Sequence, residues 1–165
     1  GIAGVIAFIL MNARYCYIEY YLEWGPCMGV NETYLEGVRR IVADDSRYTP
    51  EAYFFIQEAV TYTAEQLKRR GNSENQHITG KELLDGIRQH ALAEFGPMAR
   101  LVFGEWGIHC TEDFGNIVFS MISHNLLGAS EEDTINDFRD IYDFEKAFVE
   151  EFLPDNKDVD IPTIG

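Results

Sequence analysis

The segment FGEWGIHCTEDFG, residues 103–115, concentrates the side chains of this chain that could do chemistry. An imidazole and a thiol stand side by side at His109 and Cys110, and the carboxylates of Glu112 and Asp113 follow. Histidine or a carboxylate can act as a general acid or base in a closed site, and histidine with cysteine can bind zinc. The segment is therefore either a reactive site or a junction between helices.

A helix start accounts for most of these residue types. Thr111 is placed to cap a helix, so Glu112 and Asp113 would fall in its first turn, where carboxylates complement the positive end of the macrodipole. His109 and Cys110 then lie in the turn before the cap, and this pair supplies at most half of a zinc site. We expect a helix junction without a metal or cofactor, and a metal or nucleophile role for His109 and Cys110 is the alternative.

Outside this segment the sequence contains no HExxH, no CxxC, no glycine-rich phosphate loop and no GxSxG motif. His90 lies beside the apolar stripe of its expected helix and His124 near the end of another, positions typical of partly buried, hydrogen-bonded histidines. The side chains left for acid–base or metal chemistry are His77, His90, His109, His124, Cys110 and the acids that follow it. The candidate functional surface is Trp106, His109, Glu112 and Asp113.

The net charge of the chain restricts its partners. The formal charge is -15, and residues 130–160 hold twelve acids against three bases. Nucleic-acid affinity comes mainly from Lys and Arg displacing counterions, so we expect no nucleic-acid binding. An acidic surface favours solubility, a cation or a basic protein partner, and a self-association surface is a further alternative.

The beginning of the chain differs from the rest. Its apolar run, GIAGVIAFILM, is shorter than the roughly 20 residues of a membrane-spanning helix and lacks the preceding basic residues of a signal peptide. We expect residues 1–27 to be an extension outside the domain, with membrane association through the first ten residues as the alternative. Cys16, Cys27 and Cys110 are too widely spaced for a disulfide framework or a zinc knuckle, which favours the reducing cytoplasm.

Start and stop signals predict a mainly α fold in residues 28–153. Thr79 and Glu82 form a capping-box pattern, and Gly128 is placed to end the fifth expected helix. We expect helices between Asn31 and Asp44, between Thr49 and Gly71, at 80–95, at 98–106 and at 111–127. The second of these is apolar on more than one face, so it should be central. In the fourth we expect Leu101, Val102 and Phe103 to point inward.

The C-terminal region admits two interpretations. Ile135, Phe138, Ile141 and Tyr142 suit a helical period, but the same stretch suits a small β-hairpin near residues 128–143. With a hairpin, the three preceding helices would follow the order of a winged-helix domain. A final helix is expected from the four-residue spacing of three aromatic residues, and it should end at Pro154. These are Phe144, Phe148 and Phe152. Residues 154–165 should form a loose acidic tail.

Several blocks resemble an uncharacterised bacterial protein family best known from planctomycete and verrucomicrobial genomes. They include YTPEAYFFIQEAVTYT, HITGKELLDGIRQHALAEFGPMARLVFGEWGI, TEDFGNIVFSMISHNLL and DFRDIYDFEKAF, which together span roughly residues 32–150. The resemblance implies a small cytoplasmic protein that begins near Met28. Because the function of the family is not known, it implies no catalytic residue.

These observations favour a non-enzymatic protein-interaction module with an acidic surface. The expected helix at 111–127 carries no Lys or Arg, which disfavours the DNA-binding use of a winged helix. The alternative is a small metal-dependent or acid–base enzyme that uses His109, Cys110, Glu112 and Asp113. A homo-oligomer is compatible with either function.

Overall fold

The computed structural model describes residues 32–71, 77–129 and 133–153. The expectations for the extension at 1–27, the cap at Asn31 and the tail from Pro154 onward lie outside the described residues. Within them the chain is mainly helical and contains no strand, which confirms the mainly α fold class. None of the helices described is both long and apolar enough to cross a membrane.

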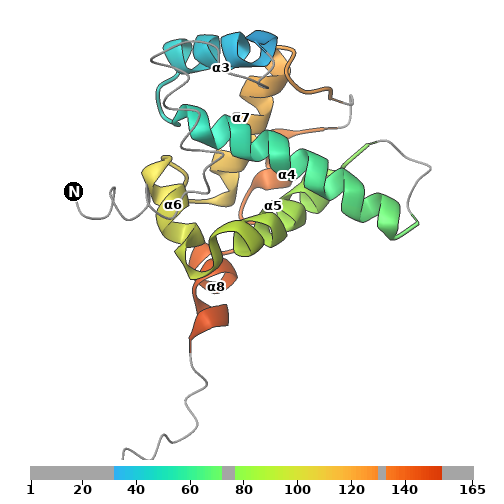
Figure 1. Ribbon diagram of the computed structural model, residues 1–165, viewed down its shortest axis with the longest axis vertical. Helices are drawn as coiled ribbons and strands as arrows, with labels where there is room; N and C mark the ends of the chain where they lie inside the picture. The colour runs from blue at the N-terminus through green and yellow to red at the C-terminus, as the bar shows by residue number, and fades with distance from the viewer. Residues whose placement is uncertain (1–31, 72–76, 130–132, 154–165) are drawn as a thin grey trace, which may run out of the picture.

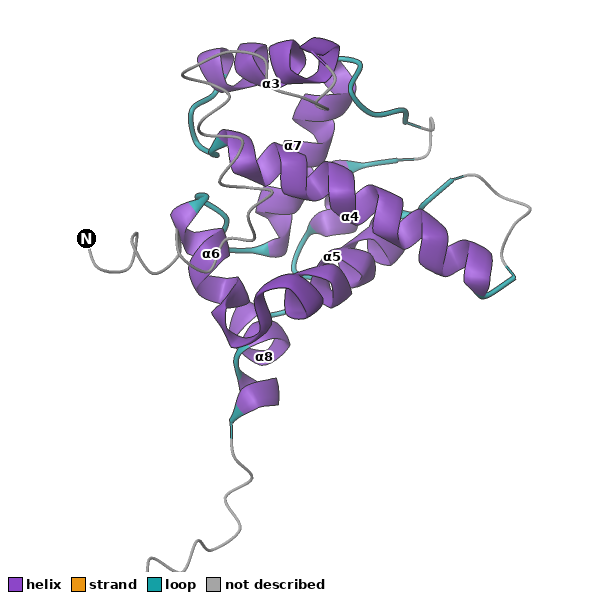
Figure 2. Ribbon diagram, in the orientation of Figure 1, coloured by secondary structure: helices purple, strands orange, loops and turns teal. Residues whose placement is uncertain are grey.

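Six α-helices and three short 3-10 helices make up this part of the chain (Figures 1 and 2). The α-helices are α3 (Glu32–Asp44), α4 (Pro50–Arg69), α5 (Gly80–Phe95), α6 (Ala99–Glu105), α7 (Thr111–Ser123) and α8 (Phe144–Phe148). The 3-10 helices are η1 (Gly96–Met98), η2 (Ile135–Phe138) and η3 (Glu150–Phe152). The bounds of α3, α4 and α5 agree with those expected from the sequence.

Helix α4 is the central element, as its apolar pattern predicted. It contacts α3, α5 and α7, and Figure 1 shows it passing between α3 and α5. Tyr53, Phe55 and Ile56 are completely buried on it. An aromatic run on one helix is thus shared among several neighbours, which is why it is apolar on more than one face.

The start of α5 has the predicted capping box. The Glu82 backbone N–H donates to the Thr79 hydroxyl at 3.3 Å, and the Thr79 N–H donates to the Glu82 carboxylate at 2.8 Å. The start of α4 differs from the prediction, because Thr49 has extended backbone but no side-chain cap hydrogen bond. Pro50 occupies the first turn of α4, where its missing N–H costs no intrahelical hydrogen bond.

Two glycines allow the helices to approach closely. A Cβ on Gly86 of α5 would overlap the Thr63 side chain of α4, whose own Cβ would lie only 2.9 Å away. A Cβ on Gly115 of α7 would lie 2.8 Å from the Cβ of Phe138 in η2. Both distances are well inside van der Waals contact, so these crossings require glycine.

Helix α7 ends earlier than predicted. It stops at Ser123, and Asn125 adopts left-handed backbone with φ of 58°. The Asn125 N–H donates to the Ile122 carbonyl at 3.0 Å and the Leu126 N–H to the Met121 carbonyl at 2.8 Å. This pattern is a Schellman motif, which asparagine can close in place of glycine. Gly128 is therefore not the stop signal.

The inward assignment of Leu101 was wrong. Leu101 is 37% exposed, whereas Val102 and Phe103 are buried as expected. In a helix, three consecutive residues span 200° of the circumference, so all three cannot face one core on a surface helix.

The final helix is also shorter than predicted. Phe144 and Phe148 are buried on α8, but the chain then tightens into η3 and leaves Phe152 45% exposed. Between residues 133 and 143 the structure has the 3-10 helix η2 and loop, with neither the α-helix nor the strands of a hairpin. Phe138 of η2 is buried against α7.

Candidate functional site

The helix junction at 106–113 is organised around the carboxylate of Asp113. Helix α7 begins at Thr111, as the expected range 111–127 has it, but its N-cap is Cys110 and not the predicted Thr111. Oδ2 of Asp113 accepts hydrogen bonds from the backbone N–H of His109 at 2.8 Å and of Cys110 at 3.2 Å. The carboxylate thus satisfies backbone donors that precede the helix, and it carries the acidic half of a capping box.

Thr111 does not cap α7 as predicted, and its side chain contacts a distant segment of the chain instead. It is the first residue of α7 and is almost completely buried. Its hydroxyl accepts a hydrogen bond from the Ile141 N–H at 3.2 Å. Thr111 therefore holds the segment that follows η2 against the start of α7, a contact between residues far apart in the sequence.

The second carboxylate oxygen of Asp113 accepts a hydrogen bond from a residue of the loop between α3 and α4. The Tyr48 hydroxyl donates to Oδ1 at 2.6 Å, and the Asn116 side chain donates to that hydroxyl at 3.1 Å. Burial opposes ionisation of Asp113, but the hydrogen bonds from Tyr48 and from the His109 and Cys110 backbone outweigh it and lower its pKa. Asp113 is therefore a fixed anion, not a general base near neutral pH.

The Cys110 thiol is not activated as a nucleophile. Its sulfur lies 3.4 Å from Oδ2 of Asp113. Burial raises the pKa of the thiol, and the Asp113 carboxylate beside it disfavours the thiolate further. Reactive cysteines require the opposite environment, a nearby positive charge that stabilises the thiolate.

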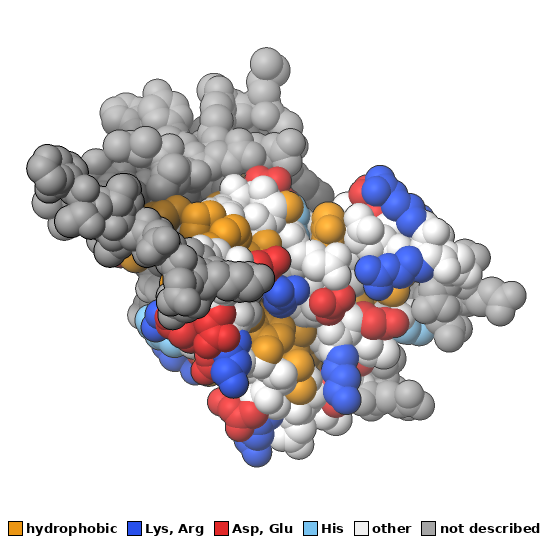
Figure 3. Space-filling model, turned by 90° about the horizontal axis from the view of Figure 1, so that it is seen from below, with side chains coloured by type: hydrophobic (Ala, Val, Ile, Leu, Met, Phe, Trp, Pro, Cys, Tyr) orange, Lys and Arg blue, Asp and Glu red, His pale blue; other side chains and the backbone are white. Residues whose placement is uncertain are grey.

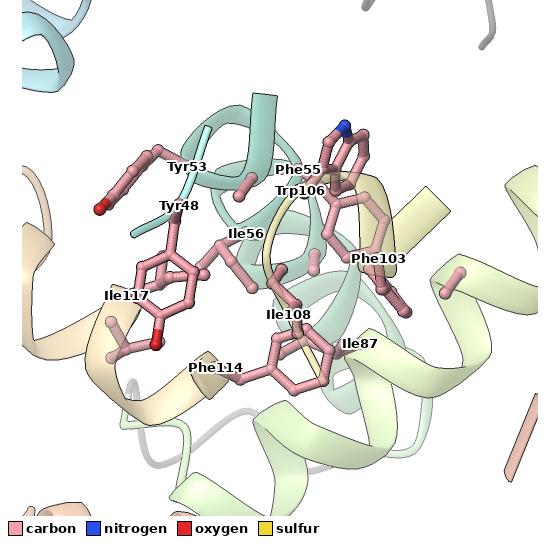
Figure 4. Packing of buried hydrophobic residues seen from close by; sticks show 14 of the residues in the cluster. Tyr48, Tyr53, Phe55, Ile56, Ile87, Phe103, Trp106, Ile108, Phe114 and Ile117 are labelled. Atoms are coloured by element: carbon pink, nitrogen blue, oxygen red, sulfur yellow. The ribbon is translucent and has the colours of Figure 1, made fainter. Parts of the chain in front are cut away.

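Trp106 belongs to the core and not to a functional surface. It is only 3% exposed, with ring centroids 5.6 Å from Phe55, 5.7 Å from Phe95 and 6.0 Å from Phe103. Figure 4 shows its indole beside Phe55 and Phe103. The sequence held this signal, since Trp106 follows Val102 by four residues and so lies on the same buried face of α6.

Glu112 forms a surface ion pair. Its carboxylate lies 3.0 Å from Nε of Arg139, and both side chains are largely exposed. An exposed pair of this kind contributes little to stability. Of the four residues in the predicted surface, His109 is exposed, Glu112 and Asp113 are half-buried and Trp106 is buried. Glu112 is ion-paired and Asp113 is hydrogen-bonded through both oxygens.

His109 is one of the residues that line a surface groove between α6 and α8. The groove has a volume of about 610 Å³. It is lined by Pro97, Arg100, Leu101, Gly104, Glu105, Ile108, His109, Asp143, Phe144, Glu145 and Val149. The spacing of apolar residues gave no sign of this groove, because it placed Leu101 in the core.

A second hollow, of about 350 Å³, opens between α4, α5, α7 and η2. Val60, Leu83, Val118 and Phe119 contribute to its mostly apolar lining, with His77 among the few polar residues. No residue of the predicted surface lies in it. It shares no lining residue with the α6–α8 groove.

The histidines do not converge. The ring of His90 packs against Phe55 with centroids 5.3 Å apart, and its Nε2 lies 3.5 Å from a Glu58 carboxylate oxygen. Nδ1 of His124 is 2.8 Å from the Ser120 carbonyl, a partner within its own helix turn. Over the described ranges no three His, Cys, Asp or Glu side chains are grouped so that they could hold a metal ion.

Comparison with known proteins adds no relative. No protein-family model, no curated protein and no solved structure matches this chain. The resemblance to the planctomycete and verrucomicrobial family therefore stays a prediction from the sequence.

Proposed function

We propose that this chain is a non-enzymatic protein-interaction module that binds a basic partner through its acidic surface. The observation that carries the proposal is the engagement of Asp113. Both of its oxygens accept hydrogen bonds, from Tyr48 on one side and from the His109 and Cys110 backbone on the other. The most suggestive chemical cluster in the sequence is thereby used to begin α7.

The enzyme alternative has less support at the same place. An acid–base or metal enzyme needs a second tuned group beside the first in a closed site. Here the Cys110 thiol has a raised pKa, Glu112 pairs with Arg139, and the His109 side chain is exposed. At the junction, therefore, neither the Cys110 thiol nor the exposed His109 is enclosed beside an activating partner.

Charge supports a basic protein as the partner. The chain carries a formal charge of -15, which raises the rate of encounter with a cationic surface and opposes nucleic acid. The winged-helix order that we expected for α5, α6 and α7 remains part of the proposal, and the absence of Lys and Arg from α7 argues against a DNA-binding use of it. We propose that these helices bind protein and not DNA. We further propose that the protein is cytoplasmic and belongs to the planctomycete and verrucomicrobial family.

Affinity capture from native cells at two ionic strengths tests the proposal. The full chain should retain one basic protein at low salt and lose it at high salt, because pairing of exposed charges is screened by salt. Metal analysis of the purified chain runs beside it. Stoichiometric zinc or iron without any salt-sensitive partner would favour the enzyme alternative and contradict the proposal.

A further inference from the structure

We propose that the groove between α6 and α8 is the docking site for a basic amphipathic helix of a partner protein. This inference rests on the proposed function and specifies the site and the chemistry of the partner. Figure 3 views the molecule from the side of α8 and shows apolar side chains exposed among acidic and basic ones. Three observations support this proposal: the exposure of Leu101, the open space around Gly104 and the charge of the residues that line the groove.

Leu101 supplies an exposed apolar contact at the groove. Its side chain is 37% exposed, whereas Ile108 and Phe144, which also line the groove, are buried. Covering this remaining apolar surface with a leucine or similar side chain would be favourable, since burial of apolar area is the main driving force of association. The partner segment therefore needs an apolar face.

Gly104 leaves room for that segment beside the backbone of α6. On α3, α5 and α7, the interior glycines Gly37, Gly86 and Gly115 each face a side chain that a Cβ would strike. Around Gly104, by contrast, no heavy atom of another described residue lies within 4 Å of a Cβ position. A glycine inside a helix costs about 1 kcal/mol relative to alanine. Close approach of a partner explains a glycine at this position, and the packing seen in the described structure does not.

The charge of the lining selects a cationic partner. Its acids are Glu105, Asp143 and Glu145, against the single permanent cation Arg100. Arg100 pairs with Glu145, and Asp143 accepts the Lys146 N–H at 3.1 Å as the cap of α8. Among the residues described, the Glu105 carboxylate has neither a hydrogen bond nor an ion pair. It is the carboxylate that a lysine or arginine of the partner would meet.

The negative charge of the chain argues against a second copy of the chain, an anionic membrane or a nucleic acid as the occupant of the groove. A second copy of this chain would bring another -15 against the first, and anionic membranes and nucleic acids would likewise be repelled. A basic helix combines an apolar face for Leu101 with cations for Glu105, as helices bound in apolar grooves do. The occupant is accordingly a different protein.

Nuclear magnetic resonance titration with a designed peptide tests the groove. The probe is a leucine–lysine amphipathic peptide of about 18 residues, roughly five helical turns. Amide shifts should concentrate at Leu101, Gly104 and Val149. A serine–lysine analogue, which lacks the apolar face, and a leucine–glutamate analogue, which reverses the charge, should each produce weaker shifts there.

Two substitutions in the groove have matched controls elsewhere. Glu105→Lys should weaken the peptide on the order of tenfold or more, whereas Glu65→Lys on exposed α4 makes the same charge change and should weaken it by less than about threefold. Gly104→Gln should weaken binding without lowering the melting temperature, because glutamine is the better helix former. Its control, Ala93→Gln on exposed α5, should bind as the unchanged chain does.

The remaining outcomes overturn the groove as the partner site. Shifts spread over the surface, or equal losses for Glu105→Lys and Glu65→Lys, would mean that charge alone attracts the peptide. If the amide shifts of groove residues changed on dilution without peptide, the occupant of the groove would be a second copy of this chain. Nuclear Overhauser contacts from Leu101 to residues 1–31 would show that the occupant is a segment of this chain itself. The proposed function survives all of these outcomes if a basic partner is captured from cells, so the two failures are distinguishable.

Discussion

The Tyr48 hydroxyl and the Asp113 carboxylate are joined by a 2.6 Å hydrogen bond between residues 65 positions apart. The bond connects the loop between α3 and α4 to the first turn of α7. Beside it, Gly107 adopts left-handed backbone with φ of 85°, and its position would bring a Cβ against the Arg47 carbonyl. The junction therefore depends on one half-buried polar contact and one close backbone approach.

Tyr48→Phe should lower the free energy of unfolding by about 1–2 kcal/mol, because Asp113 loses a hydrogen bond to a charged oxygen and Asn116 loses its acceptor. Urea unfolding followed by circular dichroism measures the loss. Tyr62→Phe is the matched control, since the Tyr62 hydroxyl makes no hydrogen bond among the described residues. Equal effects of the two substitutions would contradict a specific role for the bond to Asp113.

Acid should destabilise the protein partly through Asp113. Its pKa is lowered in the folded state, so its contribution to stability is complete above the pKa of an unfolded aspartate, about 4, and is lost as the pH falls through the lower folded value. Asp113→Asn should be less stable at pH 7 and should lose less further stability between about pH 5 and pH 3. If Asp113→Asn lost as much stability over this range as the unchanged chain, the role of Asp113 would be contradicted.

The Cys110 thiol should react slowly although its side chain is exposed. Burial of the sulfur and the neighbouring Asp113 carboxylate raise its pKa, so little thiolate is present at neutral pH. Mass spectrometry after a timed iodoacetamide pulse should show slower alkylation at Cys110 than at the cysteine of an unstructured peptide. Asp113→Asn should speed the reaction, and a faster reaction in the unchanged chain would restore Cys110 as a candidate nucleophile.

Alanine substitutions at three helical glycines should distinguish the glycines that are tightly packed from the one with open surroundings. Gly86→Ala and Gly115→Ala should destabilise by about 1–3 kcal/mol, because the new Cβ would strike Thr63 and Phe138. Gly104→Ala should be neutral or stabilise by up to about 1 kcal/mol, since its surroundings are open. Thermal unfolding of the three variants measures this order, and a destabilising Gly104→Ala would mean that α6 is tightly packed at this position.

Local signals in the sequence determined much of the helical framework. The capping box of Thr79 and Glu82, Pro50 at the start of α4 and the apolar spacing on α4 and α5 each act within one or two turns of a helix. The carboxylates after Cys110 likewise indicated a helix start, and Asp113 forms the capping box of α7 there. These features are legible in sequence because their physical cause lies within a few residues.

Tertiary contacts decided the functional assignments and the remaining helix ends. The four-residue spacing from Val102 indicates that Trp106 faces inward, but the sequence does not show that Phe55 and Phe95 lie beside it. Nor does it show that Leu101 lies where α8 leaves α6 uncovered. Tyr48 gave no sign that it would reach Asp113. Each depends on elements far apart along the chain, whose relative placement follows from the packing of the whole core and not from any local spacing.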